Sequence, residues 1–379
     1  IVMARQPFIL ILMVICLVIA SREAIYAQKK TVREQMQENV FLHPKLFYKK
    51  FFPHMKIKRD PPDSAYIKVY PHYLSVSAHV LRPAIGLDIF PGNSNGNLKY
   101  RTNIRDILGF SGSYKFVGVG FAFLLNSGAH SPDEYTKSRY RTATIKYNSK
   151  GWSLQYKYLR FKGLTDITRP SGMDPSIGFI KRPDIVNKEF QFEGLYNPAW
   201  QKYSYVAPLT FSQRQVKSRV GFLLKTGVYY SQLSGDTSLV APGKAKYYGD
   251  FKDIKAIRSL SIRLAPGVGG NIVFLRQYYF SLVAFPSYDL YLYKYLKDVD
   301  EKVKGKQAFI FGLDGKASLG YQSKRIYGGL RFEFERRSAS LSGIDIRAMY
   351  TYLGVEFGYR FNAPKIVKKI YKDTMPPGM

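Results

Sequence analysis

Long segments of this chain alternate apolar residues with polar or small ones, position by position. Near the end, Leu353, Val355, Phe357, Tyr359 and Phe361 occupy every second position, with Gly354, Glu356, Gly358 and Arg360 between them. Leu330, Phe332 and Phe334 alternate in the same way with Arg331, Glu333 and Glu335. Because successive side chains of a strand point to opposite faces, this pattern predicts strands with one apolar face.

Twelve segments from Ser64 onward suit strands. They are 64–82, 99–115, 117–126, 138–148, 151–161, 187–196, 216–233, 257–269, 278–293, 307–322, 325–337 and 346–361. All have ten residues or more, whereas strands of globular sheets usually have about 5–6. A soluble β-sandwich would show the same alternation, so strand length is what favours an all-β, antiparallel transmembrane β-barrel of about 12 strands over residues 64–361.

The connections between these segments alternate between long and short. The predicted outward connections are 83–98, 127–137, 162–186, 234–256, 294–306 and 338–345, and most inward ones are tight, such as 115–116, 148–151 and 322–324. The inward connections after the sixth and eighth segments are longer. Long loops on one side and short turns on the other are typical of outer-membrane barrels, and an even strand count returns both termini to one side.

Residues 1–27 have the features of a cleavable export signal. Arg5 precedes the uncharged run from Phe8 to Ala20, and the small-residue site Ala24-Ile25-Tyr26-Ala27 follows. A helix of 13 residues covers only about 20 Å of a ~30 Å hydrocarbon core, so this run is too short to span a bilayer. We therefore expect an address in the cell outer membrane, with 28–63 as a periplasmic lead-in and 362–379 as a basic periplasmic tail that is either solvated or bound to a partner or to lipid headgroups.

The only cysteine, Cys16, lies inside this run. A lipid-attachment role is the alternative, but apolar Leu17 to Ala20 continue after it, which places it within the signal. The exported chain then lacks disulfides, thiolate zinc sites and a cysteine nucleophile.

The chain is strongly basic, with 58 Lys and Arg against 27 Asp and Glu, a formal charge of +31. In an exported protein this charge favours outer-membrane lipid and lipopolysaccharide as partners, with other envelope proteins as further candidates and no nucleic acid. The alternative is a basic, well-solvated surface without a specific partner.

Two stretches carry a family resemblance. The run from Pro198 (PAWQKYSYVAPLTFSQRQVKSRVG) and the closing Gly358-Tyr-Arg-Phe-Asn-Ala-Pro-Lys365 resemble the domain-of-unknown-function 4421 family, and Tyr66-Ile-Lys-Val-Tyr70 and Pro266-Gly-Val-Gly-Gly270 are similar in place and order. The resemblance covers most of residues 60–375. It implies an outer-membrane barrel of the kind found in Bacteroidota, and it assigns no catalytic residue.

No catalytic, cofactor or metal motif stands out. Gly-x-Ser-x-Gly, P-loop and His-x-x-x-His patterns are absent from the sequence. His79 shares a strand face with Ser75 and Ser77, which leaves a lumenal Ser/His lipid hydrolase or acyltransferase as an alternative; a polar lumenal histidine without catalysis competes with it. His72 is expected on the opposite face of the same strand unless a bulge near Pro71 intervenes.

Charged residues recur on the faces opposite the apolar rows. A basic side chain facing lipid at mid-depth would cost ~2–4 kcal/mol, so these residues are expected to point into the lumen. The predicted lumen-lining set is Lys157, Glu193, Arg219, Arg263, Arg331, Glu333, Glu335, Glu356 and Arg360. They either pair across a narrow lumen and stiffen the barrel or line a path for a polar solute.

We therefore expect a non-enzymatic barrel that serves as a narrow channel or as a structural or complex component of the envelope; the alternatives are the lipid-modifying enzyme and a soluble secreted β-protein.

Overall fold

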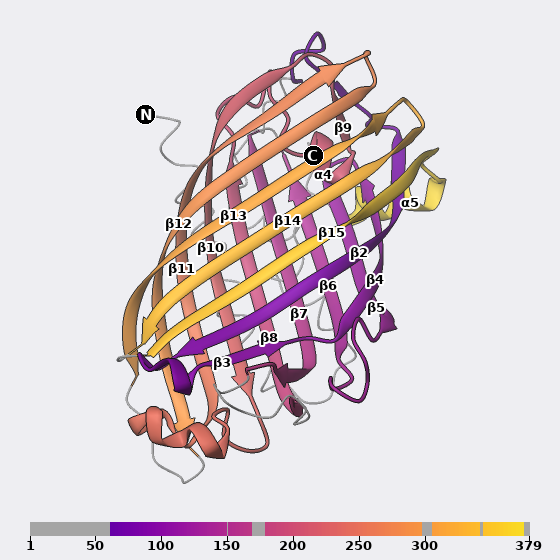
Figure 1. Cartoon of the computed structure of the whole chain (residues 1–379). Helices are drawn as coiled ribbons and strands as arrows, with labels where there is room; N and C mark the ends of the chain where they lie inside the picture. Colours follow the sequence, from indigo (N-terminus) through magenta and orange to yellow (C-terminus); the bar gives the residue numbers. More distant parts are fainter. Residues whose placement is uncertain (1–60, 150, 169–178, 298–304, 342–343, 375–379) are drawn as a thin grey trace. The chain divides into compact units, whose positions relative to one another are not determined.

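The chain folds into a closed antiparallel β-barrel (Figure 1). The computed structural model describes residues 61–149, 151–168, 179–297, 305–341 and 344–374. The barrel strands are β2 (Tyr73–Phe90), β3 (Leu98–Arg101), β4 (Ile104–Tyr114), β5 (Val117–Ser127), β6 (Arg139–Asn148), β7 (Trp152–Asp166), β8 (Ile180–Tyr196), β10 (Arg219–Ser234), β11 (Ile254–Phe274), β12 (Tyr278–Lys297), β13 (Lys306–Gln322), β14 (Ile326–Leu341) and β15 (Ile344–Asn362).

Hydrogen bonding between the last strand and the first closes the ring. β15 pairs with β2 from Asp345↔Phe90 to Asn362↔Tyr73. β3 and β4 are the two parts of one barrel strand interrupted at residues 102–103, so the thirteen hydrogen-bonded strands form a barrel of twelve. The predicted fold class is therefore confirmed.

The two ends of the barrel differ in their connections. At one end, here called the turn end, tight turns join β4 to β5, β6 to β7, β11 to β12 and β13 to β14. At the opposite loop end, the connection 235–253 carries two 3-10 helices, η2 (Pro242–Tyr247) and η3 (Gly249–Phe251), and a further one, η1 (Ser94–Gly96), joins β2 to β3. The turn end also holds the start of β2 and the end of β15.

Several predicted strand bounds were wrong at the loop end. β2 reaches Phe90, β7 reaches Asp166 and β8 begins at Ile180, so the connections predicted as 83–98 and 162–186 are much shorter. The connection after the eighth strand is also a tight turn, residues 275–277, because β11 continues to Phe274. In β7 and β8 the added residues include Lys162, Asp166, Lys181, Arg182 and Asp184, which hydropathy alone does not assign to a strand.

The barrel narrows at the loop end. β3 pairs with β7 through Tyr100↔Asp166 and Arg101↔Thr165. This pairing lies closer to the loop end than the ends of the shorter strands β5 and β6. Ten strands therefore surround the opening at the loop end. This opening is narrower than a ring of twelve strands would be.

The first predicted strand, 64–82, is in fact two elements. β1 (Ile67–Val69) pairs with β9 (Gln213–Gln215) in a separate two-stranded sheet, and β2 begins only at Tyr73. Proline has no amide hydrogen for a ladder, and Pro71 lies in the turn between the two elements. His72 lies in the same turn and is exposed, so its predicted place on a strand was wrong.

Apolar side chains cover the outside of the barrel. Val355 is 54% exposed, Phe357 64% and Phe332 37%, while Glu356 on the opposite face is 6% exposed. On β12, Phe280, Leu282, Tyr288 and Leu292 point outward, and Ser281, Val283 and Asp289 point inward. The inside of the barrel therefore holds the charges, and the outside presents the apolar rows.

The remaining helices are short. α4 (Ala207–Thr210) lies in the connection between β8 and β10, and α5 (Lys365–Thr374) forms a basic helix in the tail. No helix in the described part of the chain is long and apolar enough to cross a membrane. The predicted signal 1–27 and the lead-in up to residue 60 lie outside the described residues.

Candidate functional site in the barrel lumen

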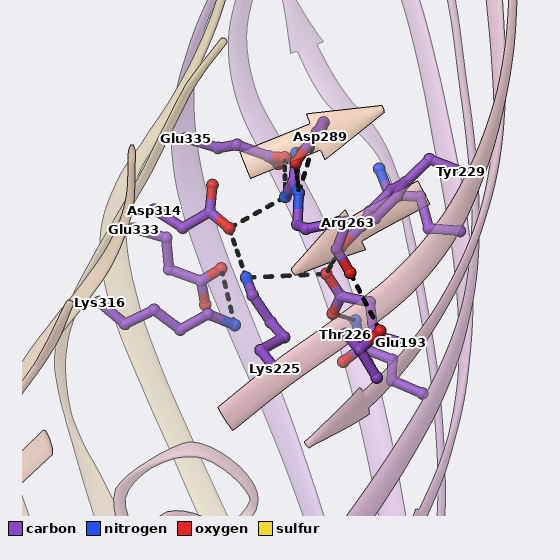
Figure 2. A network of polar contacts seen from close by, with 12 residues as sticks. Glu193, Lys225, Thr226, Tyr229, Arg263, Asp289, Asp314, Lys316, Glu333 and Glu335 are labelled. Atoms are coloured by element: carbon purple, nitrogen blue, oxygen red, sulfur yellow. Dashed lines mark hydrogen bonds and ion pairs between the residues drawn. The ribbon is translucent and has the colours of Figure 1, made fainter. Parts of the chain in front are cut away.

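A guanidinium group lies at the centre of the lumen. Arg263 on β11 is 1% exposed, and its Nε and Nη2 donate to Asp289 on β12 at 2.9 and 2.8 Å (Figure 2). Its Nη1 lies 3.0 Å from Asp314 Oδ2 on β13 and 3.2 Å from Glu335 Oε1 on β14. One cation therefore bridges carboxylates from three successive strands.

Lys225 on β10 extends this cluster toward β8 (Figure 2). Its Nζ pairs with Asp314 and lies 3.9 Å from Glu193 Oε1. Tyr229 donates to the same Glu193 oxygen at 2.6 Å, and its ring lies 4.3 Å from the Arg263 guanidinium carbon. Because these groups are removed from water, their mutual pairing offsets the cost of desolvating each charge.

A second charged group lies nearer the turn end. Arg331 on β14 pairs with Glu333, and its Nη1 lies 3.2 Å from Glu356 Oε2 on β15. Lys316 Nζ on β13 lies 3.6 Å from Glu333 Oε2. Ser77 on β2 donates to Glu356 at 2.7 Å, so this group joins the last strand to the first across the seam that closes the barrel.

Seven of the predicted lumen residues lie within or beside these two groups. They are Lys157, Glu193, Arg263, Arg331, Glu333, Glu335 and Glu356; Lys157 lines a cavity beside Arg331 and Glu333. Arg219 lies apart from them, because it is the exposed first residue of β10. Arg360 is fully buried but binds backbone carbonyls at the turn end rather than carboxylates.

A plug formed by residues 197–218, which connect β8 and β10, fills the turn end. Tyr203 in this plug is 0% exposed, and Gln215 Nε2 donates to the carbonyl oxygens of Tyr66, Lys202 and Lys217. From the barrel wall, Asn271 Nδ2 donates to Ser204 O at 2.8 Å, and Gln322 Nε2 donates to Gln213 O at 2.9 Å. The backbone of the plug is thus hydrogen-bonded to inward side chains of two strands.

The loop end is covered by the connection 235–253, here called the cap. Lys244 Nζ of the cap lies 3.1 Å from Asp166 Oδ2 on β7, and Tyr248 donates to Gly96 O at 2.8 Å. Leu239, Val240, Tyr248 and Phe251 of the cap belong to one buried apolar cluster with inward residues of the strands, including Ile85, Ile89 and Leu164. Burial of this apolar surface is the main force that keeps a cap closed.

Inward residues of the described part of the chain line two small cavities. One of about 150 Å³ is lined by His79, Lys146, Arg331 and Glu333 and by Leu209 of the plug. The other, of about 110 Å³, is lined by Glu189, Tyr229, Arg337 and Tyr350. Charged or hydroxyl-bearing side chains line both of them.

The described residues do not assemble a serine–histidine pair. His79 Nδ1 is buried without a hydrogen-bond partner, while Ser77 Oγ lies 2.7 Å from both Glu356 Oε1 and Ser111 Oγ. Nucleophilic activation needs a base within hydrogen-bond reach of the hydroxyl, and Ser77 is bound to a carboxylate instead. Among the described residues, no group of three or more His, Cys, Asp or Glu side chains is placed to hold a metal ion.

Several residues of the two charged groups and of the cavity walls are absent from the predicted lumen-lining set. They are Lys225, Tyr229, Asp289, Asp314, Lys316 and Arg337. Each shares the inward parity of its strand, and the argument that placed Arg263 in the lumen applies equally to them.

Several solved outer-membrane barrels are similar in fold to this chain. The barrel is similar to the outer-membrane protease OmpT of Escherichia coli, with 9% identity, a TM-score of 0.35, and coverage of 78% of this chain and 98% of that one. It is also similar to the translocator domain of the autotransporter NalP of Neisseria meningitidis (13% identity, TM-score 0.37, 76% and 88% covered). It is similar as well to an outer-membrane channel of Pseudomonas putida, with 10% identity, a TM-score of 0.36, and coverage of 80% of this chain and 100% of that one. Likeness this distant carries no argument about activity.

A family model matches most of the chain. A search of the curated proteins found no match. Residues 61–361, which include every strand of the barrel apart from the last residue of β15, match the model described as a domain of unknown function, DUF4421. The chain therefore belongs to the DUF4421 family.

Proposed function

We propose that this protein is a non-enzymatic outer-membrane β-barrel with a sealed lumen, which serves as a structural element of the envelope or as a component of a larger complex there. The turn end, with its tight turns and the start of β2, faces the periplasm, and the loop end faces outward.

The distribution of side chains supports a membrane location. On β12 the outward residues from Phe280 to Leu290 are apolar apart from the hydroxyl of Tyr288. Ten residue steps of a strand tilted by ~40° rise about 25 Å, which is the height of the apolar band of outer-membrane barrels. A soluble barrel would leave this band in contact with water, at a cost of about 25 cal/mol per Å² of apolar surface.

The sealed lumen is supported by one arrangement: the Arg263 cluster lies between the plug and the cap. The cluster joins β8, β10, β11, β12, β13 and β14 inside the lumen. The plug covers the turn end and the cap covers the loop end. A conducting path needs a continuous row of sites with water or exchangeable ligands, and paired charges between two covers do not supply one.

Solute retention tests this proposal. The full chain is folded into vesicles loaded with a small fluorescent anion or cation, and insertion is verified by flotation with the lipid. We expect flotation together with retention of both solutes, as in protein-free vesicles. Protein that stays in solution without detergent would contradict the membrane assignment, and rapid loss of either solute would contradict the sealed lumen.

A further inference from the structure

A row of cations crosses the outer surface of the barrel near the loop end. Strand register places Arg141 opposite Arg160, Arg160 opposite Lys188, Lys188 opposite Gln232, Gln232 opposite Arg258, and Arg258 opposite Lys294. All six side chains share the outward parity of their strands, because the residues on either side of each belong to the inward row. Neighbouring strands are about 4.8 Å apart, so five positive charges lie side by side with one amide among them.

Such a row is unfavourable on its own. Like charges placed directly opposite each other across strands are destabilising, and no carboxylate among the described residues forms an ion pair with any of the five. Arg258 Nε is also buried without a hydrogen-bond partner among the residues of the structure. This row, here called the cation row, lacks the anions that would balance it.

Cations elsewhere at the loop end do have protein partners. On the other side of the barrel, Arg82 and Arg105 lie 3.4 and 3.5 Å from Asp106, and Arg101 pairs with Asp88. The missing carboxylates are therefore a property of strands β6 to β12 and not of the whole rim. These paired arginines supply a matched control for the cation row.

Apolar and aromatic residues lie directly below the cation row, one outward position nearer the turn end. Tyr158, Phe190 and Tyr230 are register partners there, with ring centroids 5.0 and 6.3 Å apart. They are followed by Leu260 and Leu292. Aromatic girdles of membrane barrels lie at the boundary between hydrocarbon and headgroups. Arg258 and Lys294, one outward position beyond Leu260 and Leu292, therefore lie at headgroup level.

A shallow groove of about 670 Å³ joins the two rows. Arg258 and Lys294 line the part of the groove nearer the loop end, and Tyr230, Leu260 and Leu292 line the part nearer the middle of the barrel. A ligand that fills this groove needs negative charge at one end and apolar chains at the other. This polarity excludes a free anion, which has no apolar part, and a wholly apolar lipid, which has no charge.

We propose that the cation row and this groove bind a phosphorylated lipid of the outer leaflet, with its phosphates on Arg258 and Lys294 and its acyl chains along Leu260 and Leu292. The proposal rests on the membrane location proposed above and adds the class of ligand and its site. Arg forms bidentate hydrogen bonds to phosphate, and Lys supplies a compact charge, so the two residue types together suit a headgroup with more than one phosphate.

The experiment titrates the folded full chain in mild detergent with lipid A that carries two phosphates, and counts bound lipid by native mass spectrometry. The same lipid with its phosphates removed, and inorganic phosphate as a competitor, test which part of the ligand is recognised. We expect the phosphorylated lipid to bind at least about 10-fold more tightly than the dephosphorylated one, and inorganic phosphate to compete only weakly.

Two double variants with equal loss of charge give the decisive comparison. R258Q/K294Q should weaken binding about 25-fold, since each cation near the surface contributes about a 5-fold change. R82Q/R105Q, which removes two cations that are paired with Asp106, should change it by less than about 2-fold. Folding is verified by the change in gel mobility on heating. If the first double variant does not fold, the single variants R258Q and K294Q replace it, with about a 5-fold loss expected for each.

Equal losses in the two double variants would reduce the effect to net charge and overturn the proposal. Equal binding of the two forms of lipid A would overturn it as well, and so would displacement of the lipid by inorganic phosphate at the same affinity. Failure of the membrane location would be seen separately, because flotation and solute retention are measured on vesicles without lipid A.

Discussion

Arg360 on β15 donates two hydrogen bonds to the carbonyl oxygen of Phe211 in the plug, at 2.7 Å from Nη2 and 3.1 Å from Nε. Phe211 has a φ of 53° and lies at the end of α4, where backbone carbonyls lack helical partners. Its ring stacks on Tyr327 of β14 with centroids 4.4 Å apart. A residue of the last strand therefore anchors the plug to the barrel wall.

Replacing Arg360 with Gln should loosen the plug. The buried guanidinium also donates to Ser323 O at 2.6 Å, and a glutamine side chain cannot reach both carbonyls. Hydrogen bonds to charged groups contribute about 1.5–3 kcal/mol, so amide hydrogen exchange in residues 207–215 should accelerate roughly 10- to 100-fold. Arg276→Gln, in an exposed turn at the same end, is the control and should leave this exchange unchanged. Equal exchange in wild type and R360Q would show that Arg360 is not an anchor.

Replacing Arg263 with Gln should destabilise the barrel strongly. The change leaves Asp289, Asp314 and Glu335 without their shared cation in a desolvated lumen. Breaking a buried ion pair from one side costs about 3–5 kcal/mol, which urea titration of the protein in lipid vesicles will measure. The outward, exposed Arg336→Gln should change the free energy of unfolding by less than about 0.5 kcal/mol. Similar losses of unfolding free energy in the two variants would show that the Arg263 cluster does not stabilise the barrel.

Adjacent glycines of β11 give a sharp test of how the plug fits. A Cβ at Gly269 would collide with the buried hydroxyl of Tyr203, whereas at Gly270 the nearest atom is Val220 Cγ2 at 3.4 Å on the outside. Gly269→Val should therefore cost about 1–3 kcal/mol of unfolding free energy through overpacking. Gly270→Val should be close to neutral. A neutral Gly269→Val would show that Tyr203 does not occupy this slot.

Tyr203 also predicts an alkaline effect. Burial raises the pKa of its hydroxyl above the ordinary value of 10.0. Folding then favours the neutral phenol, so its contribution is complete below pH 10 and is lost as pH rises toward the folded-state pKa. The hydroxyl has no hydrogen-bond partner among the residues that the structure describes, so Tyr203→Phe should be as stable as wild type near neutral pH. The variant should lose less unfolding free energy between about pH 9 and about pH 11; an identical loss would contradict the assignment.

The barrel could be predicted because its physics is local. Period-two alternation in segments such as 346–361 and 325–337 needs only the immediate sequence, and it gave the correct number of strands. Strand ends beyond the apolar band were missed, since the ladder there is held by backbone pairing and by contacts with the cap, as at Ile180 to Val186 of β8.

The plug could not be predicted because its placement is tertiary. The connection after β8 was recognised as too long for a turn, but nothing local to residues 197–218 indicates that Tyr203 enters the barrel. That position depends on Gly221 and Gly269 leaving space and on Asn271, Gln322 and Arg360 donating hydrogen bonds from distant strands. The sequence indicated only where the strands on either side of the plug end and which wall residues carry a charge.

The sealed lumen is tested most directly by single-channel recording in planar bilayers. A conducting porin inserted into the same bilayers provides the positive control. We predict that the wild-type protein, shown to be inserted by surface labelling, gives no conductance steps, whereas the porin gives measurable ones. Stable steps of equal size from the wild-type protein would contradict the account.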